Sequence, residues 1–251
     1  MELTQQGLRS LVYKAEQLVS ASEKRSVEII RDLWVGKPLE VSKDHHKLDE
    51  RSWRFSLAPL FSCPAECLAE GGCAEDCYAI SDENLYKGAW NKDISYSFMA
   101  LTDLDRLFRL LNDQIFRFRD KYGANVRIHE RGDFFSQQYL NMWAELGISH
   151  DIPFYCFTKR RKPNGDSEFN WWRYDNAPNT VWHSSYLPDG QYNFGTEEWV
   201  KDMHSTYPSD TYVCPFYMNH KKCGLCSGSC SLCLSQRLNG KTPLFVIHKK
   251  N

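Results

Sequence analysis

The chain has 251 residues, enough for one large α/β domain or two smaller ones, and its formal net charge is only −1. This balance argues against a broadly basic nucleic-acid surface, and no apolar run approaches the roughly 18 residues that a membrane span needs. Since the first residues also lack the apolar stretch of a secretion signal, we expect a cytoplasmic protein with no membrane partner, whose thiols stay reduced unless a metal binds them.

The N-terminal half of the chain is predicted to be mainly helical. Apolar residues at helical spacing predict two helices between residues 2 and 34, within an N-terminal helical segment over residues 1–52 that packs on the core. Arg54–Leu60 then predicts a first strand. Residues 95–121 predict a helix pair joined near Thr102 and Asp103, where a capping side chain can start the second helix.

From residue 125 onward, predicted strands and helices alternate. The strands are expected at 125–129, 153–158, 180–184, 211–214 and 244–248, and the helices at 136–146 and 197–204. Such alternation indicates βαβ units with parallel pairing. We therefore expect residues 53–251 to form an α/β domain with a partial or complete TIM-barrel-like core and a cysteine-rich C-terminal segment.

Residues able to do chemistry follow several of these strands. In parallel α/β folds the loops at the carboxyl ends of strands form the site, and this rule gathers Cys63, Asp133, Lys159, Ser184 and Cys214 at one rim. Asp133 and Lys159 are the candidate catalytic groups, and Asp133 and Ser184 the candidate cofactor-binding groups.

Each of these candidates has a simpler alternative. A carboxylate after a strand can bind an amine or a ribose hydroxyl, and the basic run 159–161 can bind phosphate, but the same residues can be a helix N-terminal carboxylate and an exposed basic turn. The aromatic residues Trp171, Trp172, Tyr174 and Trp182 could stack bases or simply pack in the core. His129 and His248 could be metal ligands or proton carriers, or merely hydrogen-bonded side chains.

Nine of the ten cysteines fall into two groups that more than half of the chain separates. The first group is Cys63, Cys67, Cys73 and Cys77, and the second is Cys214, Cys223, Cys226, Cys230 and Cys233. The tenth, Cys156, lies alone in an apolar strand and is expected to be a small core residue.

This grouping predicts metal binding, because four thiolates complete either a tetrahedral zinc site or a four-iron cluster. Gaps of three, five and three residues in the first group favour a 4Fe-4S cluster, whereas the two-residue gaps in the second are typical of zinc. We expect one cluster at 63–77 and a second cluster or a zinc ion at 214–233. One cluster bridging both groups, structural zinc in both, and unligated thiols stay open as alternatives.

Several strings resemble a known family. The Cys63-Pro64 start, the Cys77-Tyr78-Ala79 finish, Val126–Ser136 and Phe154–Lys159 together resemble the gene product 88 domain family of phages and mobile elements, over roughly residues 54–248. The resemblance implies a phage-encoded protein in the cytoplasm of a bacterial host.

A weaker likeness points to chemistry. The chain is similar to radical SAM-like phage proteins in its cysteine group, which follows the first strand and ends in Cys77-Tyr78. It is also similar to them in the later strands, which end in Asp133-Phe-Phe and Thr158-Lys-Arg. The likeness implies a barrel in which three loop cysteines hold a four-iron cluster and leave one iron for S-adenosylmethionine. The cysteine gaps here differ from the usual three-then-two pattern and no Gly-Gly-Glu string follows the second strand, so S-adenosylmethionine binding stays open.

Three functions of different classes follow from these patterns. The first is a redox or radical enzyme that acts on a substrate the sequence does not identify and receives electrons from a reductant protein. The second is an electron carrier or redox sensor without turnover. The third is a zinc-stabilised module that binds nucleic acid or a host protein. The net charge of −1 disfavours nucleic acid as the partner of such a module.

Overall fold

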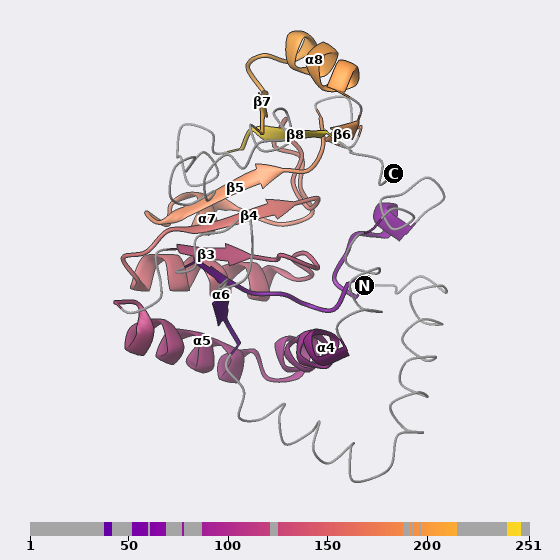
Figure 1. Cartoon of the computed structure of the whole chain (residues 1–251). Coiled ribbons are helices and arrows are strands. Elements are labelled where there is room, and N and C mark those ends of the chain that lie inside the picture. The colour runs from indigo at the N-terminus through magenta and orange to yellow at the C-terminus, as the bar shows by residue number, and fades with distance from the viewer. Residues whose placement is uncertain are drawn as a thin grey trace.

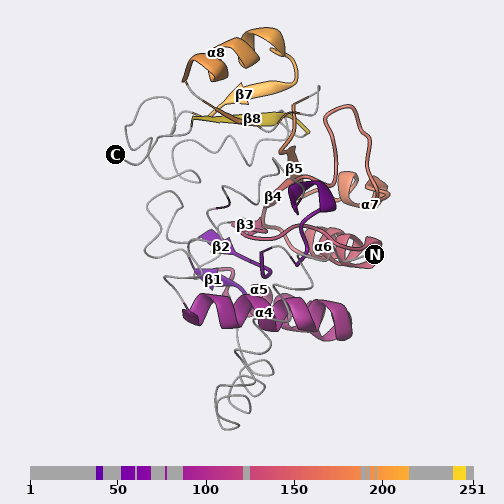
Figure 2. The same cartoon turned by 90° about the vertical axis from the view of Figure 1, so that its right-hand side faces the viewer.

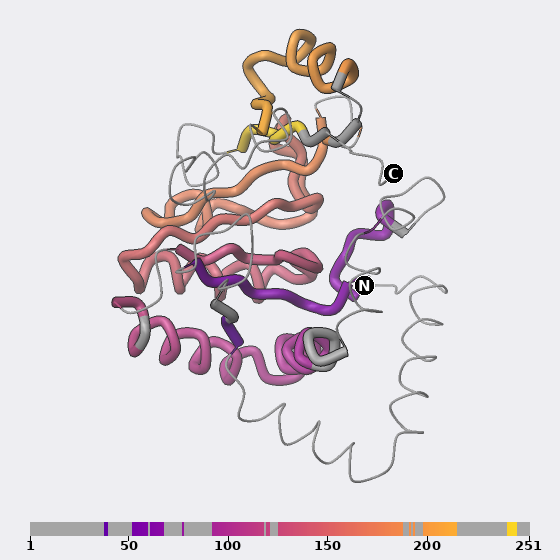
Figure 3. The backbone as a smooth tube through the Cα atoms, in the orientation of Figure 1, coloured from indigo at the N-terminus to yellow at the C-terminus, as the bar shows by residue number. Residues whose placement is uncertain are grey.

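A computed structural model of the chain describes residues 38–41, 52–59, 61–68, 77, 87–120, 125–187, 191, 193–195, 197–214 and 240–246 (Figure 3). The two helices predicted between residues 2 and 34 lie outside these ranges. Within them, helices and two sheets form a mixed α/β fold (Figure 1).

The larger sheet has its strands side by side in chain order. It contains β1 (Glu40–Val41), β2 (Ser52–Arg54), β3 (Asn125–Ile128), β4 (Phe154–Thr158) and β5 (Thr180–Ser184). β1 pairs antiparallel with β2, and the remaining neighbours pair parallel. The parallel pairing predicted from the alternation of strands and helices is therefore confirmed for β2 to β5.

The helices between these strands cover one face of the sheet. They are α4 (Lys87–Thr102), α5 (Leu104–Phe118), α6 (Gln137–Ser149) and the short α7 (Trp172–Asp175). Buried side chains of α5 and α6 share one core with Val126, Phe154 and Trp182, and in Figure 2 α6 and α7 lie to the right of the strands. This one-sided arrangement follows when consecutive parallel strands are joined by crossovers of one hand.

The helix pair has the junction predicted at Thr102 and Asp103. Asp103 caps α5, because its side-chain oxygen accepts a hydrogen bond from the backbone N–H of Arg106 at 3.1 Å. Leu107, Leu111 and Ile115 follow at four-residue spacing and are fully buried. Each such side chain contributes roughly 1.5–3 kcal/mol through removal of apolar surface from water.

The smaller sheet has β8 (Thr242–Val246) between β6 (Phe194–Gly195) and β7 (Thr211–Val213), all parallel. Helix α8 (Glu197–Thr206) connects β6 to β7. The chain entering β8 runs beside β5, since the backbone N–H of Gly240 donates to the carbonyl of Trp182 at 2.7 Å. The two sheets are thus adjacent, as Figure 1 also shows.

Two expectations about the fold need correction. A closed barrel is not found, since neither sheet closes on itself within the ranges given above. The strand expected at Arg54–Leu60 ends instead at Arg54, because its neighbour β3 ends at Ile128 and His129 then adopts the left-handed conformation (φ 58°). Beyond that point the chain still contacts the loop after β3 through a hydrogen bond from Leu57 N–H to the carbonyl of Arg131.

No helix within the described part of the chain has the length and apolar character needed to cross a membrane.

Candidate metal centre at the carboxyl edge of the sheet

The carboxyl ends of β2, β3, β4 and β5 meet at one edge of the larger sheet. The arrows of β3, β4 and β5 point to the right in Figure 1, so Figure 2 looks onto this edge. The segment after β2 carries Cys63 and leads into the 3-10 helix η1 (Ala65–Leu68), which includes Cys67. The loops after β3 and β4 carry Asp133 and Lys159, as the sequence predicted.

Ser62, directly before Cys63, is bonded to both of these loops. Its hydroxyl oxygen accepts a hydrogen bond from the backbone N–H of Asp133 at 2.8 Å, and its carbonyl oxygen accepts one from Nη2 of Arg160 at 3.0 Å. Ser62 is fully buried against Gly132, where an added Cβ would lie only 2.6 Å from the Ser62 hydroxyl oxygen. The beginning of the first cysteine group is therefore held at the edge of the sheet.

Asp133 connects the loops after β3 and β4. One carboxylate oxygen accepts hydrogen bonds from the Thr158 hydroxyl at 2.7 Å and from the Phe134 N–H at 2.8 Å. The other oxygen accepts one from the Lys159 N–H at 2.7 Å. Burial raises the pKa of Asp133 above its ordinary value, against the opposing effects of Lys159 and of these hydrogen bonds.

These contacts give Asp133 a structural role, because they join the loops after β3 and β4. Both of its oxygens accept from protein donors, and the residue is 2% exposed. The catalytic and cofactor-binding roles assigned to Asp133 from the sequence, like the catalytic role of Lys159, stay predictions.

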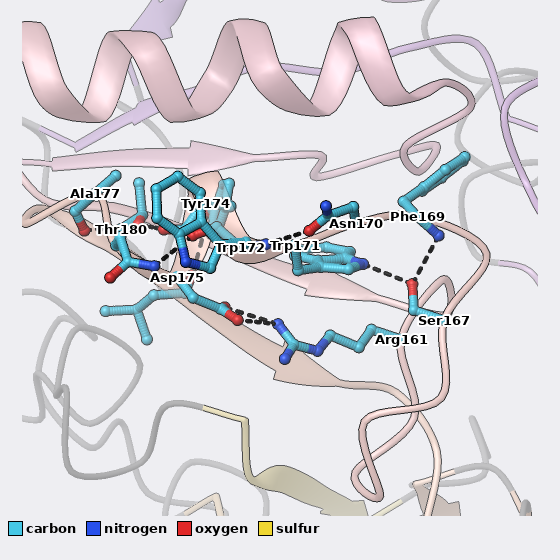
Figure 4. Close-up of polar contacts among 12 residues, drawn as sticks. Arg161, Ser167, Phe169, Asn170, Trp171, Trp172, Tyr174, Asp175, Ala177 and Thr180 are labelled. Carbon is cyan, nitrogen blue, oxygen red and sulfur yellow. Dashed lines mark hydrogen bonds and ion pairs between the residues drawn. The ribbon is translucent and has the colours of Figure 1, made fainter.

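The two arginines of the basic run are engaged with neighbouring side chains. Arg160 pairs with Glu168 at 2.8 Å and lies over the ring of Phe169. Arg161 donates to both carboxylate oxygens of Asp175 at 2.7 and 2.8 Å (Figure 4). The guanidinium groups of Arg160 and Arg161, which phosphate binding would use, are therefore already paired with carboxylates.

The aromatic segment packs mainly inside the protein. The guanidinium carbon of Arg161 lies 5.4 Å from the ring centre of Trp171 and 4.2 Å from that of Trp182. Trp171, Tyr174 and Trp182 are buried, whereas Trp172 is 70% exposed. The core-packing alternative is thus confirmed for three of the four aromatic residues, which cannot present their faces to bases without rearrangement.

Ser184 lies at the end of β5 and is fully buried. Its hydroxyl donates to the carbonyl of Tyr186 at 3.1 Å and accepts from the Tyr186 N–H at 3.0 Å, so it closes its own turn. The next residue, Ser185, donates its N–H to the carbonyl of Thr158 at 2.8 Å, which links this turn to the end of β4. The cofactor-binding role of Ser184 stays a prediction.

His129 is a buried, hydrogen-bonded histidine. Its Nε2 lies 2.8 Å from the Tyr139 hydroxyl, and the ring of Phe134 packs edge-on against it with centres 4.5 Å apart. Burial lowers the pKa of His129 to about 3. The hydrogen-bonded alternative is confirmed for His129, whereas His248 lies outside the described residues.

A network of charges at this edge was missed by sequence reasoning. Arg54 pairs with Glu130 at 2.8 Å, and Arg131 pairs with Asp93 of α4 at 2.7 Å and approaches Glu130 at 3.9 Å. The signal was the run of charged residues after β3, Glu130, Arg131 and Asp133, which indicates ion pairs with neighbouring elements. The network fixes α4 against the ends of β2 and β3.

The described cysteines supply only part of a ligand set. Cys63, Cys77 and Cys214 are half-buried and Cys67 is buried. The remaining predicted ligands, Cys73, Cys223, Cys226, Cys230 and Cys233, lie outside the described residues. Among the residues that are described, no three His, Cys, Asp or Glu side chains form a metal-binding group.

Cys214 follows β7 of the smaller sheet, and its N–H donates to the carbonyl of Leu244 in β8 at 3.2 Å.

The side chains of both cysteine groups offer only thiols as metal ligands. Thiols fit zinc or an iron–sulfur cluster better than Mg²⁺ or Ca²⁺.

Comparison with family models identifies a match over residues 35–190, to the family described as gene product 88. The chain belongs to this family. The matched part of this gene product 88 protein includes β1 to β5 and the first cysteine group. Membership is consistent with a phage or mobile-element protein. Comparisons with curated proteins and with solved structures found no match.

Proposed function

We propose that this gene product 88 protein binds an iron–sulfur cluster through thiolates of the group Cys63, Cys67, Cys73 and Cys77. One observation carries the proposal: Ser62, adjacent to Cys63, is hydrogen-bonded to Asp133 and to Arg160 at the carboxyl edge of the parallel sheet. Proteins with open parallel sheets bind their ligands at this edge. The segment that begins a four-thiol group is anchored there by contacts from two strand-end loops.

The residues around Cys63 contribute a rigid frame. The hydrogen bonds of Asp133 fix the loops after β3 and β4 relative to each other, and Ser62 joins the cysteine segment to both. A ligand set held in advance loses less conformational entropy when it binds a metal. When bound, a cluster of this kind supplies one-electron transfer.

The second cysteine group is proposed to hold a second cluster or a zinc ion. We further propose that the two sheets continue each other as part of a barrel-like arrangement in a protein of the host cytoplasm. Support for the continuity comes from the bond between Gly240 and Trp182, and from His183 of β5, whose ring packs against that of Tyr212 of β7 with centres 5.6 Å apart.

The first test is the metal content of the protein purified without oxygen. We expect iron and inorganic sulfide together with a brown colour that bleaches when dithionite is added. A further spectral change with S-adenosylmethionine would favour a radical enzyme over an electron carrier. Colourless protein that contains only zinc, after attempted reconstitution with iron and sulfide, would overturn the proposal and leave the zinc-stabilised binding module.

A pair of cysteine variants makes this test specific. Cys63→Ala and Cys156→Ala each remove one thiol, but Cys156 is fully buried in the core beside Tyr174, whose hydroxyl lies 3.6 Å from its sulfur. We expect Cys63→Ala to lose the iron of the cluster at residues 63–77 and Cys156→Ala to keep it. Equal iron content in the two variants would contradict the assignment of Cys63 as a ligand.

A further inference from the structure

The side chain of Arg160 contacts the peptide that leads into the first cysteine group: its Nη2 donates to the carbonyl of Ser62 at 3.0 Å. The same guanidinium pairs through Nη1 with Glu168 at 2.8 Å. One end of the Arg160 guanidinium therefore contacts the peptide that leads into Cys63, and the other contacts an acidic side chain.

The two members of this ion pair differ in their exposure to solvent. The side chain of Arg160 is 9% exposed, whereas that of Glu168 is 55% exposed. Water and salt screen an exposed charge much more strongly than a buried one. The positive charge of Arg160 is therefore only partly offset by Glu168 in the region of Cys63.

We propose that Arg160 is a positioning residue for the cluster and that its buried charge raises the cluster's reduction potential, an inference that rests on the proposed iron–sulfur function. Reduction adds one electron to the cluster without making or breaking a bond, so the reduced cluster carries one more negative charge. A nearby cation stabilises that added charge, and the net charge around a cluster is among the factors that set its potential.

The ion pair allows a test that distinguishes an effect of charge on the reduction potential from an effect of structure. Arg160→Gln removes the cation, and Glu168→Gln removes its counter-charge, yet both variants break the same ion pair. A charge effect lowers the potential in Arg160→Gln and raises it in Glu168→Gln. A merely structural effect shifts the potential of both variants in the same direction.

The experiment is a redox titration of the anaerobically purified full-length protein with dithionite in the presence of mediator dyes, followed by the bleaching of the cluster. We expect the order Arg160→Gln below wild type and Glu168→Gln above it. Arg160→Lys keeps the charge and should stay closer to wild type than Arg160→Gln. Shifts of the same sign in the two Gln variants, or none, would overturn the inference.

Two controls separate this inference from the function on which it rests. Arg117→Gln removes an exposed cation paired with Asp113 on α5 and should leave the potential unchanged. If wild type holds no iron and sulfide, the proposed function fails; if wild type holds the cluster but Arg160→Gln matches Arg117→Gln, only the inference fails. Glu168 is exposed, so its variant keeps the test decisive even where Arg160→Gln folds poorly.

Discussion

His129 shows how a single residue can combine backbone strain with a buried polar side chain. It adopts a left-handed conformation that non-glycine residues seldom take, and its ring lies among Phe55, Phe134, Tyr139 and Trp143. The bond from Nε2 to the Tyr139 hydroxyl satisfies one ring nitrogen. This histidine turns the chain from the end of β3 into the loop that reaches Asp133.

The low pKa of His129 predicts a contribution to the pH dependence of stability. Because burial lowers its pKa from 6.5 to about 3, the unfolded state binds the additional proton between these two pH values. The contribution of His129 is therefore complete above pH 6.5 and is lost progressively as the pH falls toward 3.

The measurement is urea unfolding of wild type and His129→Asn at pH 7 and pH 5. Asn tolerates the left-handed conformation but does not titrate. We expect the stability lost between pH 7 and pH 5 to be smaller in the variant by about 2 kcal/mol. An equal loss in both proteins would show that His129 is not held neutral by burial.

At the scale of elements, the loops after β2 and β3 fit together at Gly132. This glycine has a positive φ of 81°, and a Cβ at this position would lie 2.6 Å from the Ser62 hydroxyl oxygen and 2.9 Å from Cβ of Leu57. The close approach allows Ser62 to reach the backbone of Asp133. A side chain at residue 132 would push the two loops apart.

Gly165 offers a matched control for this contact. It has a similar φ of 92° but nothing within 4 Å of its Cβ position. We expect Gly165→Ala to cost about 1 kcal/mol from backbone strain alone. Gly132→Ala should cost roughly 2–4 kcal/mol, since overpacking adds to the strain. Chemical denaturation measures both, and equal costs would show that the loops separate without penalty.

The sequence was sufficient for elements whose side chains repeat with a clear period. The strand predicted at 180–184 coincides with β5, and the junction of the helix pair falls at the capping residue Asp103. The two-residue strands β1 and β6 were missed, because their pairing depends on neighbours distant in the chain. The contact between Ser62 and Arg160, 98 residues apart, likewise has no local signal.

Part of the candidate site could also be predicted from the sequence. The rule for carboxyl ends of strands brought Cys63, Asp133 and Lys159 to one edge, because it needs only strand order and direction. That rule does not reveal which polar atoms are already satisfied. The bonds of the Asp133 carboxylate to Thr158 and Lys159 depend on the register of β3 and β4, which the amino-acid pattern does not specify.

At the scale of the whole molecule, the two cysteine groups follow strands of different sheets. Cys63 comes after β2 of the larger sheet and Cys214 after β7 of the smaller one. Two separate metal centres would therefore each depend on their own sheet. One centre bridging both groups would instead depend on how the sheets are held together.

Metal content distinguishes these arrangements. With two centres, Cys63→Ala and Cys214→Ala should each remove a different part of the bound metal, and the double variant should lose the sum of the two. Elemental analysis of the three variants and wild type measures this. If each single variant already loses as much as the double variant, the groups share one centre.

The distance along the chain between Ser62 and its partners also bears on the order of events during synthesis. Asp133 follows Ser62 by 71 residues and Arg160 by 98, so the first cysteines leave the ribosome well before the residues that anchor them exist. Until then the nascent thiols are exposed to oxidants and to stray metal ions. Loading of the proposed metal centre at this edge is therefore expected only after translation has passed β4, when Asp133 and Arg160 can anchor the cysteine segment.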